Sequence, residues 1–380
     1  MEKLKILLVV GARPNFMKIA PIMEAFEKFA DVAEPVLLHT GQHYDHAMKA
    51  LLFDQLGLPV PSIDLEVRGG THAEQTANIM LRFEPVLDKL KPAAVLVVGD
   101  VNSTIACALV AVKKQIPVVH VEAGLRSRDL AMPEEVNRLL TDQISSRLYT
   151  TERLGNENLQ SEGISADRIV FAGNVMIDTL LKNKKIAPEL KEVLATNGLG
   201  KAEEVIEASQ GRYIFMTLHR PSNVDSPETL RSLLECLSSI SRTVPIVFAI
   251  HPRTKGNIER FGFQSLLDES AIYTAPPVGY LDSITLMSNA FVVMTDSGGI
   301  QEETTALGVP CITMRENTER WITVTEGTNT IVGVDPVKIT NAFNDLLAGQ
   351  GKAGRQPEFW DGHASERIVE DLICWLKKGA

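Results

Sequence analysis

The sequence has few cysteines, no long apolar run and no excess of positive charge. Its 380 residues include four cysteines, which lie in apolar contexts without the spacing of a metal site. We therefore expect reduced thiols in the protein core, and neither a disulfide framework nor a zinc site. The four residues are Cys107, Cys236, Cys311 and Cys374.

The first apolar run, Ile6 to Val10, is too short for a signal peptide or a membrane-spanning helix. The formal net charge of −10 argues against general binding of nucleic acid or of membrane surfaces. We therefore expect a cytoplasmic protein with neither of these partners. Local Arg and Lys side chains and helix ends would have to hold any anionic ligand.

Familiar nucleotide-binding motifs are also missing. No GxGxxG follows the first apolar run, the chain has no Walker-type phosphate loop, and it has no internal repeat or low-complexity segment. The sequence therefore offers no motif for a nicotinamide cofactor or for a Walker-type nucleotide site.

What the chain does have is a regular alternation of short β-branched runs and amphipathic stretches, which is typical of parallel α/β domains. Its length suggests two of them. We predict two Rossmann-like doubly wound domains facing a central cleft, residues 1–180 and 181–364. Residues 182–211 have the pattern of a helical linker region, and residues 365–380 that of a C-terminal helix for which the N-terminal domain offers a packing surface.

The predicted strands follow from the β-branched runs. In the first domain they are Leu4–Val10, Pro35–His39, Ala94–Val98, Pro117–Val121, Arg147–Thr150 and Arg168–Ala172. In the second they are Tyr213–Leu218, Ile246–Ile250, Ala271–Thr274, Phe291–Met294, Pro310–Thr313 and Thr330–Gly333. Since doubly wound sheets bind ligands at the carboxyl ends of their strands, the residues that follow these runs are the candidates for function.

The most informative run is Thr295–Glu303, which leads from an apolar strand into a helix. Gly298 and Gly299 would let a phosphate approach the backbone, and the helix N-terminus would favour its charge. Glu302 and Glu303, one turn further on, could accept hydrogen bonds from ribose hydroxyls, as an acidic residue does in dinucleotide sites. The run therefore predicts a site for a nucleoside diphosphate, although an ordinary glycine-rich loop remains the alternative.

Carboxylates dominate the strand ends of the first domain. Asp100 stands at a strand terminus, where helix capping is the ordinary role and a carboxylate facing the cleft is the functional one. Glu122 follows an apolar strand, and burying it is costly unless it is paired or functional. Glu134 and Glu135 begin a helix, where acidic residues usually complement the helix dipole. A polar turn at Thr40–His46 predicts a substrate-facing segment, since its spacing fits no common metal site.

Cations gather at other strand ends. In the first domain, the turn Gly11–Lys18 carries Arg13 and Lys18, which suit a diphosphate. The second domain offers His219 and Arg220 at one strand end, His251 and Arg253 at another, and Arg315 and Arg320 near a third. This division, with acids in one domain and a diphosphate grip in the other, predicts an enzyme acting on a nucleotide sugar.

Taken together, these motifs resemble the non-hydrolysing UDP-N-acetylglucosamine 2-epimerases. The matching segments occur in family order along nearly the whole chain: Gly11–Lys18, Thr40–His43, Gly99–Thr104, His120–Arg126, Pro133–Arg138, Gly173–Asn174, Thr217–Asn223, Thr295–Glu303 and Thr318–Arg320. The resemblance implies a fold of the GT-B type, usually a homodimer, with no metal and no cofactor. It also implies the reversible conversion of UDP-N-acetylglucosamine to UDP-N-acetylmannosamine, through elimination of UDP to 2-acetamidoglucal and re-addition of UDP.

The resemblance also implies roles for individual residues. Asp100 and Glu122 would handle protons, Glu134 would position or share a proton, and His219 would stabilise the departing diphosphate. Contacts to the nucleotide would come from residues of both predicted domains: Arg13, Lys18, Ser297, Gly298, Gly299, Glu303 and Arg320.

The chain departs from the family pattern in two places. The turn at Gln42–Asp45 differs from the one that builds a second, regulatory substrate site in some bacterial members. Trp321 stands where the family usually has proline, beside Arg320, and this change bears on which sugar fits. A 2-epimerase of a UDP-diacetamido-uronic acid would share nearly every motif, and a glycosyltransferase of the same fold would also bind a nucleotide sugar.

Overall fold

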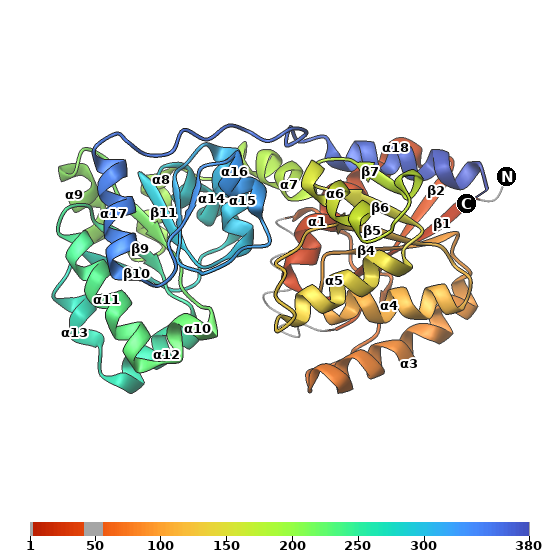
Figure 1. Ribbon diagram of the computed structural model, residues 1–380, viewed down its shortest axis with the longest axis horizontal. Coiled ribbons are helices and arrows are strands. Elements are labelled where there is room, and N and C mark those ends of the chain that lie inside the picture. Colours follow the sequence, from red (N-terminus) through yellow and green to blue (C-terminus); the bar gives the residue numbers. More distant parts are fainter. Residues whose placement is uncertain (1–2, 42–55, 380) are drawn as a thin grey trace. The chain divides into compact units, whose positions relative to one another are not determined.

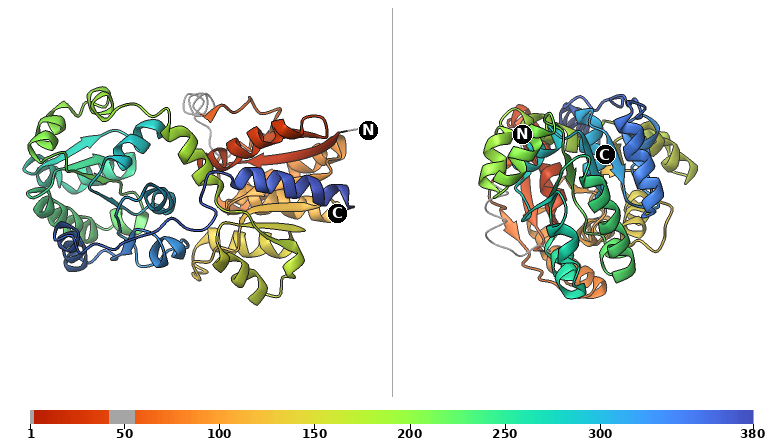
Figure 2. Two further views of the ribbon diagram at one scale, coloured as in Figure 1. Left: turned by 90° about the horizontal axis from the view of Figure 1, so that it is seen from above. Right: turned by 90° about the vertical axis from the view of Figure 1, so that its left-hand side faces the viewer.

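The chain divides into two α/β units, which we describe one at a time. The computed structural model describes residues 3–41 and 56–379. The first unit comprises Met1–Thr179 together with Glu358–Ala380, and the second comprises Leu180–Pro357. Figures 1 and 2 show the elements of each unit, coloured along the chain.

The first unit is built on a seven-stranded parallel sheet in the order β3-β2-β1-β4-β5-β6-β7. This is the doubly wound Rossmann order, in which the chain reverses direction across the sheet between β1 and β4. The strands are β1 (Leu4–Val10), β2 (Ala33–His39), β3 (Ile63–Asp64), β4 (Ala94–Val98), β5 (Val118–Ala123), β6 (Arg147–Thr150) and β7 (Ile169–Phe171).

Helices cover both faces of this sheet, as Figure 1 shows. They are α1 (Arg13–Ala25), α3 (His72–Leu90), α4 (Asn102–Lys113), α5 (Pro133–Ile144), α6 (Arg153–Ser161), the start of α7 (Val175–Lys184), and α18 (Ala364–Lys377) from the end of the chain. Short 3-10 helices occur at Phe26–Phe29 and Ala166–Arg168. Because helices shield both faces, the central strands are largely apolar instead of alternating regularly with polar residues.

The last helix, α18, belongs to the first unit. Asp371 on α18 accepts hydrogen bonds from Arg147 and from the hydroxyl of Tyr149, and its Oδ1 lies 2.6 Å from Nη2 of Arg147. The N-terminus of α18 donates backbone N–H groups of Ala364 and Ser365 to the buried carboxylate of Asp178. The chain end is thereby fixed to β6 of the sheet and to α7.

The second unit repeats the topology with six parallel strands in the order β10-β9-β8-β11-β12-β13. They are β8 (Ile214–Met216), β9 (Ile246–Ala249), β10 (Ile272–Ala275), β11 (Val292–Thr295), β12 (Cys311–Thr313) and β13 (Asn329–Ile331). Alternate strand residues enter two apolar clusters: Val292 and Met294 pack in one, and Val293 packs in the other. The prediction of two doubly wound parallel units is therefore confirmed.

The helices of this unit are α8 (Leu190–Thr196), α9 (Gly200–Ala208), α10 (Pro221–Val224), α11 (Pro227–Ser241), α12 (Pro252–Phe261), α13 (Gln264–Asp268), α14 (Tyr280–Ser288), α15 (Gly298–Leu307), α16 (Trp321–Thr325) and α17 (Pro336–Leu347). Within residues 3–41 and 56–379, no helix combines the length and the apolar character needed to cross a membrane.

Two expectations from the sequence were wrong. Residues 182–211 are largely helical as predicted, but they are not a linker, because Val193, Leu194 and Ile206 on α8 and α9 are buried in the core of the second unit. Their apolar positions are few, but helical spacing places them on one face. Cys374 is an exposed free thiol on α18, not a core residue, whereas the other three cysteines are free and buried as expected. Although Cys374 lies among apolar residues in the sequence, it is on the outer face of the amphipathic helix α18.

Candidate active site

In the first unit, Asn15 joins the ends of two neighbouring strands. Its Oδ1 accepts hydrogen bonds from the backbone N–H groups of Gly11 and Ala12, at 3.3 and 2.9 Å, and its Nδ2 donates to the carbonyl of Val98 at 3.0 Å. The turn after β1 is therefore fixed against the end of β4. This is the reversal point of the sheet, where doubly wound folds bind their ligands.

Lys18, on the next turn of α1, reaches the carboxylate of Glu122 and forms an ion pair with it. Both residues are buried, at 5% and 2% exposed. The sequence predicts that a buried Glu122 is either paired or functional, and the structure shows the pairing. The sequence predicts Lys18 as a contact for the nucleotide, but in the structure its ammonium group contacts this carboxylate.

The backbone around Glu122 is unusual. Its φ of +71° lies in the left-handed region, which a residue with a side chain adopts only at a cost, and the ladder between β5 and β6 is irregular between Val121 and Ala123. On the facing strand end, a Cβ added at Gly99 would lie 3.0 Å from Nζ of Lys18. Gly99 is thus packed against the ion pair, and its own φ of +67° also favours glycine.

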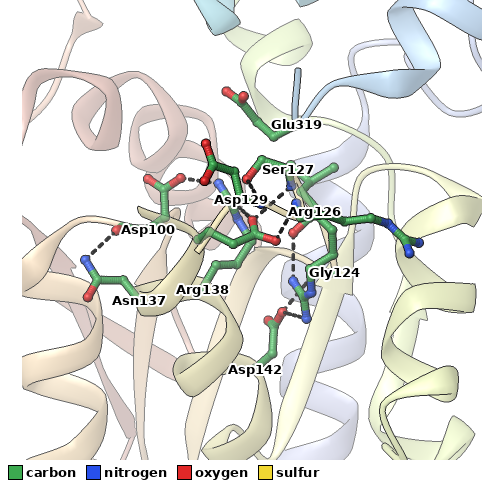
Figure 3. A network of polar contacts seen from close by, with 12 residues as sticks. Asp100, Gly124, Arg126, Ser127, Asp129, Asn137, Arg138, Asp142 and Glu319 are labelled. Carbon is green, nitrogen blue, oxygen red and sulfur yellow. Dashed lines mark hydrogen bonds and ion pairs between the residues drawn. The ribbon is translucent and has the colours of Figure 1, made fainter. Parts of the chain in front are cut away.

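Asp100, the next residue, forms an ion pair with Arg138 (Figure 3). Arg138 on α5 is 1% exposed, and the side chain of Asp100 is 21% exposed. Asn137 donates to the backbone carbonyl of Asp100 at 2.9 Å. The N-cap of α4 is Val101, so the capping alternative for Asp100 is wrong.

Two neighbouring glutamates in the first turn of α5 differ sharply in their surroundings. The buried carboxylate of Glu135 accepts hydrogen bonds from the backbone N–H groups of Ser127 and Arg128, both at 2.9 Å. Glu134 is only partly buried. Glu135 therefore holds the loop after β5, while Glu134 remains partly exposed.

The structure thus gathers Lys18, Glu122, Gly99 and Asp100 at the carboxyl edge of one sheet. No cluster of three or more His, Cys, Asp or Glu side chains among the described residues has the arrangement of a metal site. The chemistry of this edge is that of carboxylates held by cations, which suits proton transfer.

In the second unit, α15 begins at Gly298, directly after β11. Its N-cap residue, Ser297, makes no side-chain capping bond, and its first turn has no acidic residue. The N–H groups at such an end favour an anion. A Cβ at Gly298 would lie 2.6 Å from Oε1 of Glu319, whereas one at Gly299 would meet nothing within 4 Å. A side chain at position 298 would therefore clash with Glu319, whereas position 299 has room for one.

Asp296 connects the ends of β8 and β11. It is 0% exposed, and its Oδ2 accepts backbone N–H groups of His219 and Arg220 at 2.9 and 2.7 Å. Its Oδ1 lies 2.9 Å from Nδ1 of His219. Burial opposes ionisation of this carboxyl, but His219 and the N–H groups outweigh burial and lower the pKa of Asp296. An ionised Asp296 therefore fixes His219, whose ring is partly exposed.

Several cations and acids surround the start of α15. Nε of Arg320 lies 3.4 Å from the carboxylate of Glu302, and Glu303 is buried at 5% exposed. Arg315 donates from Nη2 to Glu319 at 3.1 Å, and its buried Nη1 has no hydrogen-bond partner among the described residues. A Cβ at Gly298 would lie 3.9 Å from this Nη1. A donor group thus remains near the helix N-terminus.

The expectation for His251 and Arg253 was only partly right. The His251 ring lies 5.7 Å from the ring of His219, as two adjacent strand ends predict. However, Nδ1 of His251 accepts the backbone N–H of Arg253 and so caps α12, and Arg253 forms an ion pair with Asp225. Burial, with the neighbouring His219 and Arg253, lowers the pKa of His251. These two residues therefore have structural partners.

Some predicted residues fall outside the described part. Arg13 is the first residue of α1, but the structure does not describe its side chain. Residues 42–55, which include most of the predicted substrate-facing turn with His43, Asp45 and His46, are likewise outside it. Trp321 begins α16 beside Arg320 and is 37% exposed.

Sequence reasoning assigned no role to Asn15, Arg138, Asp142 or Asp296. Each is a buried polar residue that bonds to a strand end distant in the sequence. Their only signal is a polar side chain at a position where helical or strand periodicity predicts an apolar one. That signal does not name the partner, which is 77 residues away for Asp296 and His219.

Two parallel doubly wound units, one with carboxylates at its strand ends and one with an anion-favouring helix terminus, define a protein of the GT-B fold class. The sequence profile of the family described as UDP-N-acetylglucosamine 2-epimerase matches residues 27–373. The chain belongs to this family.

Individual relatives agree with this assignment. The chain is 41% identical over 372 residues to the UDP-N-acetylglucosamine 2-epimerase of Methanocaldococcus jannaschii, a match that covers 97% of this chain and 99% of that protein. The same identity, over 372 residues with the same coverage, relates it to UDP-2,3-diacetamido-2,3-dideoxy-D-glucuronate 2-epimerase of Pseudomonas aeruginosa.

Solved structures give the same result. The M. jannaschii UDP-GlcNAc 2-epimerase, in complex with UDP-GlcNAc and UDP, superposes with a TM-score of 0.85 over 97% of this chain and 99% of that one, at 41% identity. The Neisseria meningitidis enzyme bound to UDP-GlcNAc has a TM-score of 0.83 over 97% of this chain and 100% of that one, at 29% identity.

Proposed function

We propose that this protein is a non-hydrolysing epimerase that interconverts UDP-N-acetylglucosamine and UDP-N-acetylmannosamine without metal or cofactor. The observation that carries the proposal is the pair of cation-bound carboxylates, Glu122 with Lys18 and Asp100 with Arg138, at adjacent strand ends of a member of this family. Inversion at a carbon requires proton removal on one face and proton return on the other, and two carboxylates can divide these tasks.

The reaction proceeds in two steps, an elimination of UDP and its re-addition. A base removes the proton from sugar carbon 2, and its electron pair forms the double bond between carbons 1 and 2 while the bond from carbon 1 to the phosphate oxygen breaks. This yields 2-acetamidoglucal and UDP. Re-addition of UDP to carbon 1 then accompanies protonation of carbon 2 from the opposite face.

Each residue has a part in these steps. Asp100 and Glu122 remove the proton from carbon 2 and return it, and the partly exposed Glu134 positions or shares that proton. His219, held by Asp296, stabilises charge on the departing diphosphate. The N-terminus of α15 at Ser297, Gly298 and Gly299 binds that diphosphate.

The remaining contacts to the nucleotide come from four side chains. Glu303 accepts from the ribose, and Arg13, Lys18 and Arg320 contribute positive charge. The ion pairs of Lys18 with Glu122 and of Arg320 with Glu302 fix where those two charges lie.

Incubation with UDP-N-acetylglucosamine alone in heavy water tests the proposal. The enzyme should place deuterium on carbon 2 and form the manno epimer without an acceptor. Free N-acetylmannosamine with UDP would instead identify a hydrolysing epimerase, and an unlabelled sugar that turns over only with an acceptor would identify a glycosyltransferase. An Asp100→Asn variant is the matched control for background exchange.

The second candidate substrate is a UDP-diacetamido-uronic acid. It is favoured by the 41% identity to the P. aeruginosa enzyme, equal to the identity to the M. jannaschii enzyme. Running the labelling experiment with each nucleotide sugar in parallel decides between them, because the true substrate will show the larger kcat/KM.

We further propose a homodimer, formed through the first unit. Leu81 on α3 and Leu140 on α5 are 70% and 52% exposed, and Leu130 just before α5 is 71% exposed. Both α3 and α5 pack against α4, and an apolar patch across these helices would favour a protein partner. Sedimentation of the wild type and of a Leu81→Arg/Leu140→Arg variant tests this proposal, and a monomeric wild type would refute it.

A further inference from the structure

His120 is a fully buried histidine with no part in the proposed proton transfers. It lies on β5, two residues before Glu122, and is 0% exposed. Its Nε2 lies 2.8 Å from the backbone carbonyl of Gly99, at the end of β4. Its Nδ1 lies 2.7 Å from Oδ1 of Asp142 on α5.

Both ring nitrogens of His120 must carry hydrogen. A carbonyl oxygen can only accept, so Nε2 is the donor toward Gly99. Asp142 accepts the backbone N–H of Gly124 at 3.1 Å, and its Oδ2 lies 2.7 Å from Nη2 of Arg126. These contacts suit an ionised carboxylate, which also can only accept, so Nδ1 is a donor as well. The ring is therefore a buried imidazolium.

The charges around this ring alternate in sign. Positive His120 contacts negative Asp142, which contacts positive Arg126, and Arg126 in turn pairs with Glu162 at 2.6 Å. Burial opposes ionisation of Asp142, but His120 and Arg126 outweigh burial and lower the pKa of that carboxyl. The half-buried Glu162 ends the series, so no charge in it lacks an opposite neighbour.

Asp142 contacts residues on both sides of Glu122. It binds the ring of His120, two residues before Glu122, and the N–H of Gly124, two residues after it (Figure 3 shows the Gly124 side). Between these contacts lies the strand irregularity where Glu122 adopts its left-handed conformation. Such conformations persist only where the surroundings determine them.

We propose that His120 and Asp142 form a charged clamp that positions the two catalytic carboxylates; the catalytic part of this inference rests on the proposed function. Asp142 fixes the backbone next to Glu122 through its bond to Gly124. His120 connects Asp142 to the carbonyl of Gly99, the residue before Asp100. His120 and Asp142 are positioning residues, because both are 0% exposed and act through the residues that they contact.

Asp142→Asn is the discriminating variant. Its amide oxygen can still accept from Gly124, but its NH₂ group would face Nδ1 of His120, which must then lose its hydrogen. The ring becomes neutral while the bond to Gly99 remains. Glu162→Gln is the matched control, because it neutralises a carboxylate at the far end of the same series, away from both strand ends.

Three measurements test the clamp. Nitrogen-15 NMR of the ring should show two protonated nitrogens in the wild type and only Nε2 protonated in Asp142→Asn, at the pH of the activity assay. Amide hydrogen exchange at Glu122–Gly124 should become faster in Asp142→Asn only. The variant's kcat should fall by roughly tenfold to a hundredfold, on the lower scale of misplaced acid–base groups, with KM and UDP affinity retained. Glu162→Gln should leave all three readouts at wild-type values.

The proposal is overturned by a neutral wild-type ring, by unchanged exchange in Asp142→Asn, or by an equal loss of kcat in Glu162→Gln. The wild-type spectrum requires no variant, so a poorly folded variant does not remove the test. If the wild type catalyses no epimerisation, the proposed function fails in the labelling experiment. The ring spectrum and the amide exchange would still decide whether the clamp exists.

Discussion

Replacing Asp296 by asparagine would remove the negative charge beside His219 and leave the size of the side chain nearly unchanged. The two side chains have nearly equal volume, but asparagine is neutral, and its amide has an NH₂ donor in place of one carboxylate oxygen. Its single oxygen can keep the bonds that Oδ2 of Asp296 accepts from the backbone of His219 and Arg220 and from Asn223 at 3.2 Å. Its NH₂ group would then face Nδ1 of His219.

The consequence for His219 is a change of tautomer. In the wild type, Nδ1 lies 2.9 Å from Oδ1 of ionised Asp296, which favours a hydrogen on Nδ1, so Nε2 is the nitrogen available to exchange a proton with a ligand. Opposite an NH₂ group, Nδ1 must accept, and the hydrogen of a neutral ring moves to Nε2. A reversed tautomer of this kind costs about 10⁴ in turnover in serine proteases. We expect turnover to fall by about 100-fold or more.

The cost in stability follows from the same contacts. A hydrogen bond to a charged group contributes about 1.5–3 kcal/mol. Asp296→Asn loses one such contact and weakens the others, so the free energy of unfolding of the second unit should fall by about 1.5–3 kcal/mol. Asp296→Ala leaves three donors, two part-buried and one buried, without this acceptor and should cost about 3–5 kcal/mol, given that such losses do not add fully.

The pH dependence has a defined sign. The pKa of Asp296 is lowered in the folded protein, where its contacts outweigh burial. A carboxyl of this kind contributes stability that is present above its unfolded pKa and is lost as pH falls through its folded-state pKa. The second unit should therefore lose stability on acidification, and Asp296→Asn should lose less of it.

Hydrogen exchange of peptides from the second unit, measured over a urea series, gives the local free energy without assuming two-state unfolding of the whole chain. Asp225→Asn is the matched control, because Asp225 is an exposed carboxylate paired with Arg253 in the same unit. Its effect should lie within about 0.5 kcal/mol. Wild-type turnover and stability in Asp296→Asn would refute the reasoning.

Three further predictions concern the first unit. Asp100→Asn should cut turnover by about 100-fold or more while calorimetry shows nearly unchanged UDP binding; near-normal turnover would remove Asp100 from the mechanism. Arg13→Ala should mainly weaken UDP binding, and an unchanged affinity would contradict its assignment. Lys18→Met should leave the buried Glu122 without its cation and cost about 3–5 kcal/mol in denaturant unfolding. Adding Glu122→Gln should recover part of that loss, and strictly additive effects would exclude coupling between the two residues.

The architecture could be predicted from the sequence because its signals are local. A parallel strand buried on both faces is an apolar run, and each run here precedes a turn with glycine or polar residues. β1, β4 and β6 accordingly lie at the predicted bounds. β3 escaped prediction because its two residues, Ile63 and Asp64, are too few to form a pattern.

The candidate residues at strand ends could also be named, because parallel strands deliver their carboxyl ends to one edge of a sheet. Glu122, Asp100, His219 and the start of α15 were identified in this way. The assignment of residues 182–211 as a linker failed because a weakly apolar, charged stretch does not reveal whether its few apolar residues reach a core.

The sequence by itself thus determined the two parallel sheets and the order in which acidic, basic and glycine residues reach their edges. Only the tertiary structure decided which charges meet: Lys18 with Glu122, Arg138 with Asp100, and Asp296 with His219. The physical reason is that periodicity arises from neighbours along the chain, whereas a buried ion pair joins residues brought together by folding. Its energy depends on a distance and a degree of burial that no local pattern encodes.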